Sequence, residues 1–475
     1  MIGMLPVSET RVLDINAEAL GVDVCTLMGN AGAALAGVLD RYSGKKYVFV
    51  CGSGNNGGDG FAAAGIMENE DVTVCLMGPE SSIRSEVSKK YFLSLNCPII
   101  PFEELNIDDY EVLVDCALGT GTEGNIKHPY DEFVKLAKEF KGTVVSADIP
   151  TGLGCDISII PDVTVSFNNS KTGMTEENSG EIIVADIGIP EEAYKVVGPG
   201  DMYRYPIPEK NSHKGQNGRL LIIGGGPYIG APAMSGLSAL RTGTDIVTIA
   251  TPEKIIGSVA SYSPIFTFHP LRNEMKNAEC EILRPTHIPD LLKISNNYDA
   301  ILIGPGLGID EDTVSAVKKF VSSCRIPLVV DADAIGSLGK DPDVSVPAVY
   351  TPHRKEFEKL GGISFDEAGV SDVAASLKGV VLLKGREDII SDGKRVRINR
   401  TGTPAMTVAG TGDVLSGIVA GFLSKGMIAF DASCLGAYVC GKAGELAFET
   451  YSYGLMATDI IERIPLILKE GLSKL

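Results

Sequence analysis

Two glycine-rich segments have features that suit the binding of phosphate. Residues 52–60 read GSGNNGGDG, and residues 409–413 read AGTGD. Each segment precedes a run of small and apolar residues, FAAAGIM after the first and VLSGIVAGFL after the second. A glycine-rich turn that opens a helix directs several backbone N–H groups and the positive end of the helix dipole to one place. Both segments are therefore candidate sites for an anionic ligand.

The first segment also carries polar side chains. Asn55, Asn56 and Asp59 add hydrogen-bond donors and acceptors to the turn. A glycine-rich loop between a strand and a helix also occurs as a plain turn, which is the alternative interpretation. Two adjacent amides serve a plain turn poorly, so they favour a ligand or an ion.

Two aspartates follow strands that the sequence predicts in the same half of the chain. Asp115 lies in LVDCALGTGTEG and Asp148 in VSADIPTGL. The carboxyl ends of parallel strands form one edge of a sheet, where ligands bind. A carboxylate there can exchange a proton or hold a cation, while capping of a turn or helix is the alternative. Lys171, in SFNNSKTGM, is expected to be a solvated loop lysine.

Asp413 closes the second segment, directly after three residues whose amides can receive phosphate. Amides at 410–412 would stabilise charge on a transferred phosphoryl group, and Asp413 would act as a base toward a hydroxyl. Because a helix N-terminus favours a carboxylate, we expect the pKa of Asp413 to be lowered. Its alternative role is that of an ordinary first-turn residue.

Asp331 and Asp333, in VVDADAI, can approach magnesium or the substrate, or cap the next helix.

Short β-branched runs that end in glycine-rich turns recur along the chain and must position these residues. Helical patterns separate most of them, so we expect parallel sheets flanked by helices in an α/β fold. A length of 475 residues exceeds what one hydrophobic core usually supports. The segment 198–218 is rich in Gly, Pro and polar residues, so we place a boundary near residue 206, between domains 1–205 and 206–475.

Composition narrows the classes of protein further. With 44% apolar and 22% charged residues, the chain should fold as a globular protein. A net charge of -19 argues against broad affinity for nucleic acid or membranes. Ten cysteines without a CxxC pair fit reduced, mostly buried thiols. With no signal-peptide pattern and no run of 18 apolar residues, we expect a cytoplasmic enzyme.

The first half resembles a known family. GSGNNGGDG, DCALGTG and SADIPTGL, in this order, are similar to the three signature segments of the NAD(P)HX epimerases, which interconvert the R and S forms of hydrated nicotinamide cofactors. The resemblance implies a Rossmann-like fold, catalysis at Asp148, and K⁺ held by Asn56, Asp115 and Thr151. The substrate-binding residues that it implies are Asn55, Asn56, Gly57, Gly58, Asp59, Gly119, Thr120, Gly121, Thr122, Glu123, Gly124, Asn125 and Asp148.

The second half resembles the ribokinase-like NAD(P)HX dehydratases. KGRED (384–388) with GTGD is similar to the ribokinase-like superfamily, and HKGQNGRLLIIGGG, GPGLG, TPHRKEF and TGTPAMTVAGTGDVLSG are similar to the dehydratases. A three-layer α/β/α fold is implied, with Asp413 catalytic. The implied contacts of the hydrated cofactor are Ala239, Gly306, His353 and Asp413. The implied ADP contacts are Lys384, Gly385, Arg386, Glu387, Asp388, Thr403, Pro404, Ala405, Met406, Thr407, Val408, Ala409, Gly410, Thr411 and Gly412.

Together the two resemblances imply repair of damaged nicotinamide nucleotides. Hydroxide is a poor leaving group, and phosphorylation by ADP, with Mg²⁺ shielding the phosphates, would replace it by phosphate and release AMP. A dehydratase selective for the S form would leave the R form unrepaired. An epimerase on the same chain would convert the R form to the S form. The expected partners are NADHX, NADPHX and further copies of the chain in a homo-oligomer, with no nucleic acid and no membrane.

A different class of function also fits the fold pattern. Residues 206–475 could form an ATP-dependent kinase of the vitamin-precursor type, since such kinases share GTGD. Residues 1–205 would then be a noncatalytic Rossmann-like binding module. Formation of AMP from ADP together with restored reduced cofactor would exclude the kinase. Equilibration of the R and S hydrates, lost in Asp148→Ala, would exclude the binding module.

Overall fold

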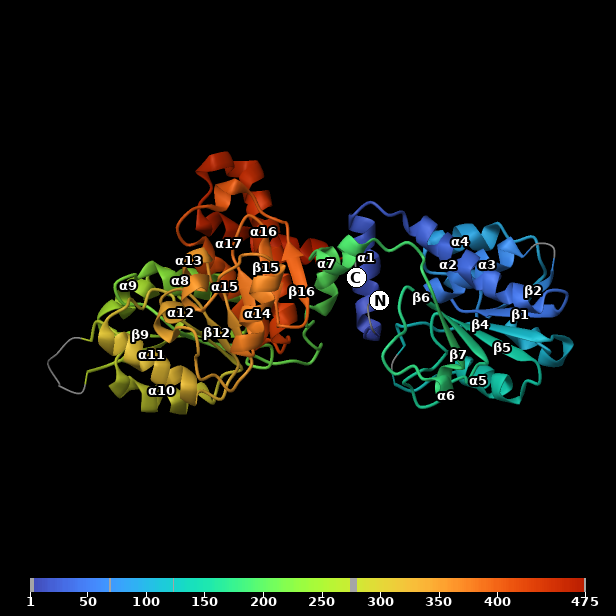
Figure 1. Ribbon diagram of the computed structural model, residues 1–475, viewed down its shortest axis with the longest axis horizontal. Helices are drawn as coiled ribbons and strands as arrows, with labels where there is room; N and C mark the ends of the chain where they lie inside the picture. The colour runs from blue at the N-terminus through green and yellow to red at the C-terminus, as the bar shows by residue number, and fades with distance from the viewer. Residues whose placement is uncertain (1–3, 68–69, 123, 274–279, 474–475) are drawn as a thin grey trace. The chain divides into compact units, whose positions relative to one another are not determined.

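The computed structural model describes residues 4–67, 70–122, 124–273 and 280–473 (Figure 1). The chain divides into two compact units, Met1–Ala193 and Tyr194–Leu475. The sequence places the boundary near residue 206, and the segment between the two positions packs with the second unit. There Val197 N donates to Ile398 O over 2.9 Å, and Asp201 pairs with Arg397 over 3.0 Å. These bonds give the segment fixed partners despite its turn-rich composition.

The first unit contains a parallel sheet of seven strands in the order β3-β2-β1-β4-β5-β6-β7. Every neighbouring pair is parallel. The order runs outward in both directions from β1 and β4, so a crevice is expected beyond the carboxyl ends of these two strands. This is the Rossmann-like arrangement that the sequence predicts. The strands are β1 (Lys46–Cys51), β2 (Asp71–Leu76), β3 (Ile99–Pro101), β4 (Val112–Cys116), β5 (Thr143–Ala147), β6 (Val163–Phe167) and β7 (Glu181–Ala185).

Helices cover both faces of this sheet, which explains why its central strands are apolar throughout. In Figure 1, α2, α3 and α4 lie on one side of the sheet and α5 and α6 on the other. Helix α2 approaches α3 closely, since a Cβ on Gly32 would lie 2.5 Å from the Cβ of Ala62. The helices of this unit are α1 (Val7–Ala19), α2 (Val24–Leu39), α3 (Asn55–Ile66), α4 (Glu86–Leu93), α5 (Tyr130–Glu139) and α6 (Glu176–Ser179). The short helix α7 (Glu191–Lys195) crosses the boundary between the two units.

The second unit contains a sheet of nine strands in the order β10-β9-β8-β11-β12-β13-β14-β15-β16. The strands from β10 to β14 are parallel, and β15 and β16 add an antiparallel edge. The strands are β8 (Arg219–Ile223), β9 (Ile246–Pro252), β10 (Thr267–Leu271), β11 (Ala300–Ile303), β12 (Leu328–Val330), β13 (Ala348–Tyr350), β14 (Val380–Leu383), β15 (Asp388–Ser391) and β16 (Val396–Asn399).

Two apolar cores lie on the two faces of this sheet, which gives the expected three layers. One core joins the sheet to α8, α9, α15, α16 and α17, and the other joins it to α10 through α14. The helices are α8 (Gly230–Arg241), α9 (Ile256–Ala260), α10 (Ile288–Ser295), α11 (Glu311–Ser323), α12 (Asp333–Leu338), α13 (Arg354–Lys359), α14 (Glu367–Leu377), α15 (Thr411–Ser424), α16 (Ala429–Tyr451) and α17 (Ala457–Leu472). Within the described ranges, no helix has the length and apolar character that a membrane span needs.

Helix α15 is fixed against α8 by small residues. A Cβ on Gly417 would lie 2.1 Å from Oγ of Ser238, and a Cβ on Gly421 would lie 3.2 Å from Cα of Ala239. Side chains larger than hydrogen at these positions would separate the helices. This packing holds the first turn of α15, where Asp413 lies, in a fixed place.

Candidate active sites

Close backbone contacts shape the turn between β1 and α3 in the first unit. A Cβ on Gly52 would lie 1.9 Å from the carbonyl oxygen of Ala117, and a Cβ on Gly57 would lie 2.0 Å from that of Gly52. Only glycine fits at either position. The turn therefore lies directly against the end of β4, and α3 begins at Asn55. The sequence-predicted ligand turn and the Asp115 strand end thus share one edge of the sheet.

Asp115 is fully buried and organises the loop that follows β5. Its carboxylate accepts bonds from Ser146 Oγ (2.8 Å), Thr151 N (2.8 Å) and Thr151 Oγ1 (2.6 Å). Burial raises the pKa of Asp115, although these hydrogen bonds act in the opposite direction. Asp115 thereby holds Thr151 beside the end of β4.

The three predicted potassium ligands lie together, with one buried oxygen atom that lacks a partner. Asn56 Nδ2 donates to the carbonyl oxygen of Leu118 over 3.3 Å, while Asn56 Oδ1 is buried and accepts no hydrogen bond in the described structure. Thr151 Oγ1 lies 3.4 Å from the same carbonyl oxygen. A buried polar atom without a partner costs free energy, and a bound cation would supply that partner. The sequence did not single out the carbonyl of Leu118.

Asp148 lies at the end of β5 in an unusual backbone conformation and pairs with a buried lysine. Its φ is 61°, in the left-handed region. Its Oδ1 accepts bonds from Phe167 N (3.2 Å) and from Lys171 Nζ. The expectation that Lys171 is a solvated loop residue is wrong, since it is only 1% exposed and also donates to Phe167 O over 2.9 Å. The chain after β6 turns back over the strand end and carries the lysine inward.

The N-terminal helix α1 brings a further carboxylate, Asp14, to this site. The burial of Asp14 and the nearby Asp148 carboxylate raise its pKa to about 7, against the opposing effect of Lys171 and Arg11. Burial, Asp148 and Asp14 likewise raise the pKa of Asp59 well above its usual range. Sequence reasoning missed Asp14, because one aspartate in an amphipathic helix carries no signal of its own.

The other predicted epimerase residues lie around the same turn. Gly119 lies in the loop after β4 and close to the start of α3, since a Cβ on Gly119 would lie 3.2 Å from the Cβ of Asn56. Asn55 is exposed at the start of α3, whereas Gly57 and Gly58 are buried beneath it. Thr120, Gly121, Thr122, Gly124 and Asn125 continue the loop after β4, and Glu123 lies outside the described residues. The ligand turn and this loop therefore adjoin at the carboxyl ends of β1 and β4.

In the second unit, Asp413 lies in the first turn of α15. It directly follows the GTG turn of residues 410–412, which begins at the left-handed Gly410 (φ 95°). The expected lowering of its pKa is wrong. Burial, and the carboxylates of Asp331 and Asp333, raise the pKa of Asp413 to about 7, while Lys384 acts in the opposite direction. A helix terminus stabilises a carboxylate by only about 1 kcal/mol, which desolvation and like charges exceed here.

Lys384 lies beneath the same turn, paired with a buried carboxylate. Its Nζ is 3.0 Å from Asp331 Oδ1, which also accepts a 2.8 Å bond from Thr351 Oγ1. A Cβ on Gly412 would lie 3.3 Å from this Nζ. Burial acts to lower the pKa of Lys384, but Asp331 and Glu356 raise it above its usual value. A fixed ammonium thus lies beside the backbone amides of the GTG turn.

The remaining predicted nucleotide contacts lie in two loops near Lys384. The loop 384–388 joins β14 to β15 and is shaped by Asp388, which accepts bonds from Gly385 N (3.1 Å) and Asn399 Nδ2 (3.0 Å). Arg386 and Glu387 are exposed on this loop. The loop 403–410 begins with a short 3-10 helix, η8 (Pro404–Met406), and leads into α15. Because Lys384 adjoins Gly412, the two loops meet at one edge of the sheet.

Besides Asp413, three residues are predicted to contact the hydrated cofactor, and they differ in how exposed they are. His353 caps α13, accepting a 3.2 Å bond at Nδ1 from Glu356 N, and its side chain is 55% exposed. Gly306 is buried against the carbonyl of Tyr228, where a Cβ would lie 2.2 Å from the oxygen. Ala239 is fully buried between α8 and α15. Its side chain therefore packs the helices, and its contact with the hydrated cofactor stays a prediction.

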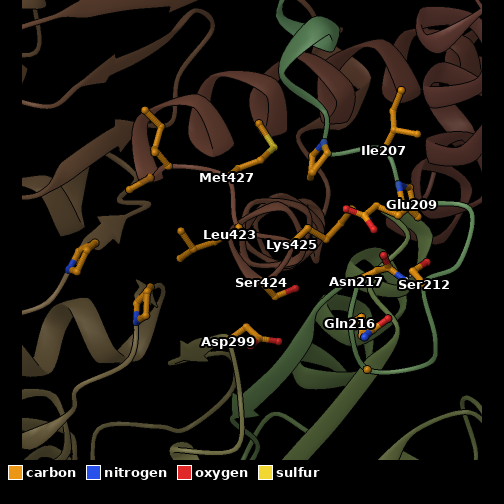
Figure 2. Close-up of a pocket in the computed structure, with 18 residues that line it drawn as sticks. Ile207, Glu209, Ser212, Gln216, Asn217, Asp299, Leu423, Ser424, Lys425 and Met427 are labelled. Carbon is orange, nitrogen blue, oxygen red and sulfur yellow. Dashed lines mark hydrogen bonds between the residues drawn. The ribbon is translucent and has the colours of Figure 1, made fainter. Parts of the chain in front are cut away.

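A pocket of about 910 Å³ lies elsewhere in the second unit (Figure 2). Asp299, Pro327 and Pro347 line it directly before β11, β12 and β13, so it opens at the amino ends of the strands. Ser424 lines it at the end of α15, about 16 Å along the helix from Asp413. The pocket is therefore separate from the edge where Lys384 and Asp413 meet.

Comparisons with known proteins match both units. A family model described as NAD(P)H-hydrate dehydratase matches residues 220–466, and one described as YjeF-related protein N-terminus matches residues 24–173. The bifunctional NAD(P)H-hydrate repair enzyme Nnr of Pyrobaculum aerophilum is 38% identical, with 97% of each chain covered. The enzyme of the same name from Archaeoglobus fulgidus is 38% identical, covering 96% of this chain and 97% of the relative.

Solved structures resemble the second unit. The ADP/ATP-dependent NAD(P)H-hydrate dehydratase of Bacillus subtilis, co-crystallised with ATP and Mg²⁺, is 28% identical with a TM-score of 0.50; the match covers 58% of this chain and 99% of that one. A ribokinase-like superfamily protein of Enterococcus faecalis is 25% identical with a TM-score of 0.51, over 58% of this chain and 96% of that one.

Proposed function

The chain belongs to the family of bifunctional NAD(P)H-hydrate repair enzymes, and from that membership we propose how its residues divide the work. It repairs hydrated NADH and NADPH through an epimerase and a dehydratase carried on one chain. This membership decides against the alternative of a vitamin-precursor kinase fused to a binding module. The roles of individual residues follow from the two sites described above.

In the dehydratase, Asp413 takes the proton from the ring hydroxyl while that oxygen attacks the terminal phosphoryl group of ADP. The bond to AMP breaks, and AMP carries away the electron pair. Phosphate then leaves the ring carbon, and loss of a neighbouring ring proton restores the double bond of NAD(P)H. The backbone amides of residues 410–412 stabilise the charge that develops on the phosphoryl group. The observation that carries this proposal is the Lys384 ammonium beside Gly412, next to Asp413.

Magnesium fits this site as a partner of the nucleotide phosphates. Asp331 and Asp333 are close enough to Asp413 to raise its pKa, and carboxylate oxygens are the ligands that Mg²⁺ prefers. Because the described residues contain no group of three or more such side chains that could hold a metal by themselves, the nucleotide phosphates would supply the other ligands. Bound there with the nucleotide, magnesium would shield the phosphate charge. The ATP and Mg²⁺ of the Bacillus subtilis dehydratase support this assignment.

The epimerase must invert a carbon that bears both a hydroxyl group and the ring nitrogen, because water adds to an enamine at the carbon next to nitrogen. Such a carbon inverts when its C–N bond opens to an aldehyde and closes again from the other face. Opening requires a base for the hydroxyl proton and an acid for the nitrogen. We assign the base to Asp148, which Lys171 holds in place through their buried ion pair.

Potassium would hold the substrate loop of the epimerase in place. The proposed ligands are Asn56, Asp115 and Thr151, to which we add the carbonyl oxygen of Leu118. The partnerless Asn56 Oδ1 supports an ion at this point. No group of three or more His, Cys, Asp or Glu side chains that could hold a metal occurs in the described part of the chain. A site of one carboxylate with neutral oxygens suits a monovalent cation better than a divalent one.

The test follows the absorbance of reduced nicotinamide when the whole chain receives ADP and a mixture of both NADHX epimers. We expect the full mixture to return to NADH, with AMP and phosphate as the other products. Asp413→Asn should stop all return, and Asp148→Asn should leave only the S fraction to recover. Full recovery in Asp148→Asn would remove Asp148 from the epimerase site. Assembly into a homo-oligomer and a cytoplasmic location remain predictions.

A further inference from the structure

The end of β13 lies between the two strand ends that carry Asp331 and Lys384, since β13 pairs with β12 on one side and with β14 on the other. Just past β13, Thr351 Oγ1 donates to Asp331 Oδ1 over 2.8 Å, and the carbonyl oxygen of Pro352 accepts a 2.9 Å bond from Lys384 N. His353 is the next residue, and more than half of its side chain is exposed. Its imidazole therefore lies at the same edge of the sheet as Lys384 and is accessible to a ligand.

Hydrogen bonds at the start of α13 determine which nitrogen of this imidazole carries a hydrogen atom. Glu356 N donates to Nδ1 of His353 over 3.2 Å, so Nδ1 is the accepting nitrogen. A neutral imidazole that accepts at one nitrogen carries its hydrogen on the other. His353 therefore presents its N–H group at Nε2. Such a ring can donate a hydrogen bond at Nε2, but it cannot take up a proton there.

The side chain of Glu356 holds the ring in this orientation. Its Oε2 accepts a 2.8 Å bond from His353 N, which completes a reciprocal capping box. Its Oε1 lies 3.5 Å from His353 Nε2, the nitrogen that carries the hydrogen atom. The carboxylate belongs to a side chain that is only 13% exposed, so its position is fixed by packing. A negative charge held beside Nε2 favours the tautomer with its hydrogen at that nitrogen.

We propose that Glu356 is a positioning residue of the dehydratase, which fixes His353 as a neutral donor that binds the carboxamide oxygen of the hydrated nicotinamide ring. The proposal rests on the dehydratase mechanism given above. In that mechanism Asp413 takes the hydroxyl proton, and Lys384 and the amides of residues 410–412 receive the phosphoryl group. These groups leave the carboxamide of the ring unbound, and its carbonyl oxygen accepts hydrogen bonds. His353 thus orients the ring and does not act as a second base.

Two substitutions at His353 separate the donor at Nε2 from the helix cap at Nδ1. His353→Asn keeps an oxygen that can cap α13 but has no donor at the position of Nε2. We expect it to raise KM for (S)-NADHX about tenfold, with kcat and Tm nearly unchanged, because an orienting contact acts on the bound substrate before and during the reaction. His353→Gln places an amide N–H near the position of Nε2 but caps a helix poorly. It should keep KM within about threefold of the parent and lower Tm by a few degrees.

Glu356→Gln tests the role of the carboxylate itself. Glutamine can still accept from His353 N, so Tm should change little. KM for (S)-NADHX should rise roughly threefold or more, because the charge beside Nε2 is lost. In the His353→Asn background the same change should have no further effect on KM, since Glu356 acts through the ring. The matched control is Glu358→Gln, an exposed change on the same helix, which should leave KM and Tm unchanged.

Two further measurements on the full chain identify the nitrogen and the acceptor. Nitrogen-15 spectra of the histidine rings should show the hydrogen of His353 at Nε2, with its signals assigned by their loss in His353→Asn. The hydrate of the thionicotinamide analogue of NADH has sulfur, a weak acceptor, in place of the carboxamide oxygen. With this hydrate, His353→Asn should have the same KM as the parent.

Four results overturn the proposal. A ring of His353 with its hydrogen at Nδ1 removes the donor at Nε2. A KM in His353→Asn within about twofold of the parent removes the contact, and an equal rise of KM for both hydrates assigns it to another group of the cofactor. Additive effects of Glu356→Gln and His353→Asn show that Glu356 does not act through the ring. Failure of the dehydratase mechanism is distinct, since it appears as full turnover of (S)-NADHX in Asp413→Asn.

Discussion

The Lys384 ammonium and the Asp331 carboxylate lie 3.0 Å apart beneath the turn that opens α15. Asp331 is nearly inaccessible to solvent, so the lysine compensates a charge that water cannot reach. The same ammonium adjoins Gly412 and can attract a phosphoryl group. One side chain thus serves both the fold and the nucleotide site.

These two roles can be separated by mutation. Lys384→Met should lower kcat/KM for ADP by about a hundredfold or more and also lower Tm, because it leaves Asp331 without its partner. Adding Asp331→Asn should restore Tm without restoring activity. The measurements are initial rates with (S)-NADHX and thermal unfolding of both variants. Recovery of activity in the double variant would show that Lys384 acts only through Asp331.

The dehydratase should depend on the ionisation of Asp413. With a pKa raised to about 7, the carboxylate that acts as base becomes populated as the pH rises through neutrality. Below that point, kcat/KM for (S)-NADHX should fall about tenfold per pH unit, and above it the value should level off. The measurement is a pH profile at limiting substrate. A profile flat from pH 5 to 8 would contradict a base role for this carboxyl group.

The same pKa predicts a pH-dependent stability. The pKa of Asp413 in the folded chain lies above its unfolded value, so its contribution is fully present below about 4 and is lost as the pH rises through about 7. Asp413→Asn carries no charge at any pH. Thermal unfolding should give Asp413→Asn a higher Tm than the parent at pH 8, by roughly a few degrees, and the same Tm at pH 4. A constant difference at both values would point to packing instead of ionisation.

Potassium should stabilise the first unit and its activity. Ligand binding to the folded state raises Tm with concentration, so KCl should raise it more than an equal concentration of tetramethylammonium chloride. Thr151→Val removes an oxygen ligand and should abolish the difference together with most R conversion. Thr151→Ser keeps Oγ and is the matched control. Equal effects of both salts on the parent chain would argue against a cation at Asn56.

Local patterns predict the architecture well because each strand and each glycine turn depends on nearby residues. Strand runs that end near Asp115 and Asp148 indicate which side chains share an edge of the first sheet. The run that ends before Lys384 does the same for the second sheet. Ala239 shows the limit: its sequence context is a helix, and only the packing of α8 on α15 decides that it is buried. Membership in a motif does not specify which face of a helix a residue takes.

Electrostatic behaviour is harder to predict, because it depends on residues distant in sequence. The local sequence predicts that Lys171 is a solvated loop lysine, but the chain after β6 folds back and pairs it with Asp148. The local sequence predicts that the helix N-terminus lowers the pKa of Asp413, but burial and the carboxylates of Asp331 and Asp333, from a different βα unit, raise it. In both cases desolvation and long-range partners outweigh the local effect on which the sequence argument relied.

Mixing two disabled chains tests whether two separate sites act one after the other. Asp148→Asn retains the dehydratase and Asp413→Asn retains the epimerase, and each is incubated with both NADHX epimers and ADP, alone and combined. We predict that Asp148→Asn alone stops at the S fraction, that Asp413→Asn alone restores no NADH, and that the mixture restores both epimers. A mixture that stops at the S fraction would contradict two separate sites acting in sequence.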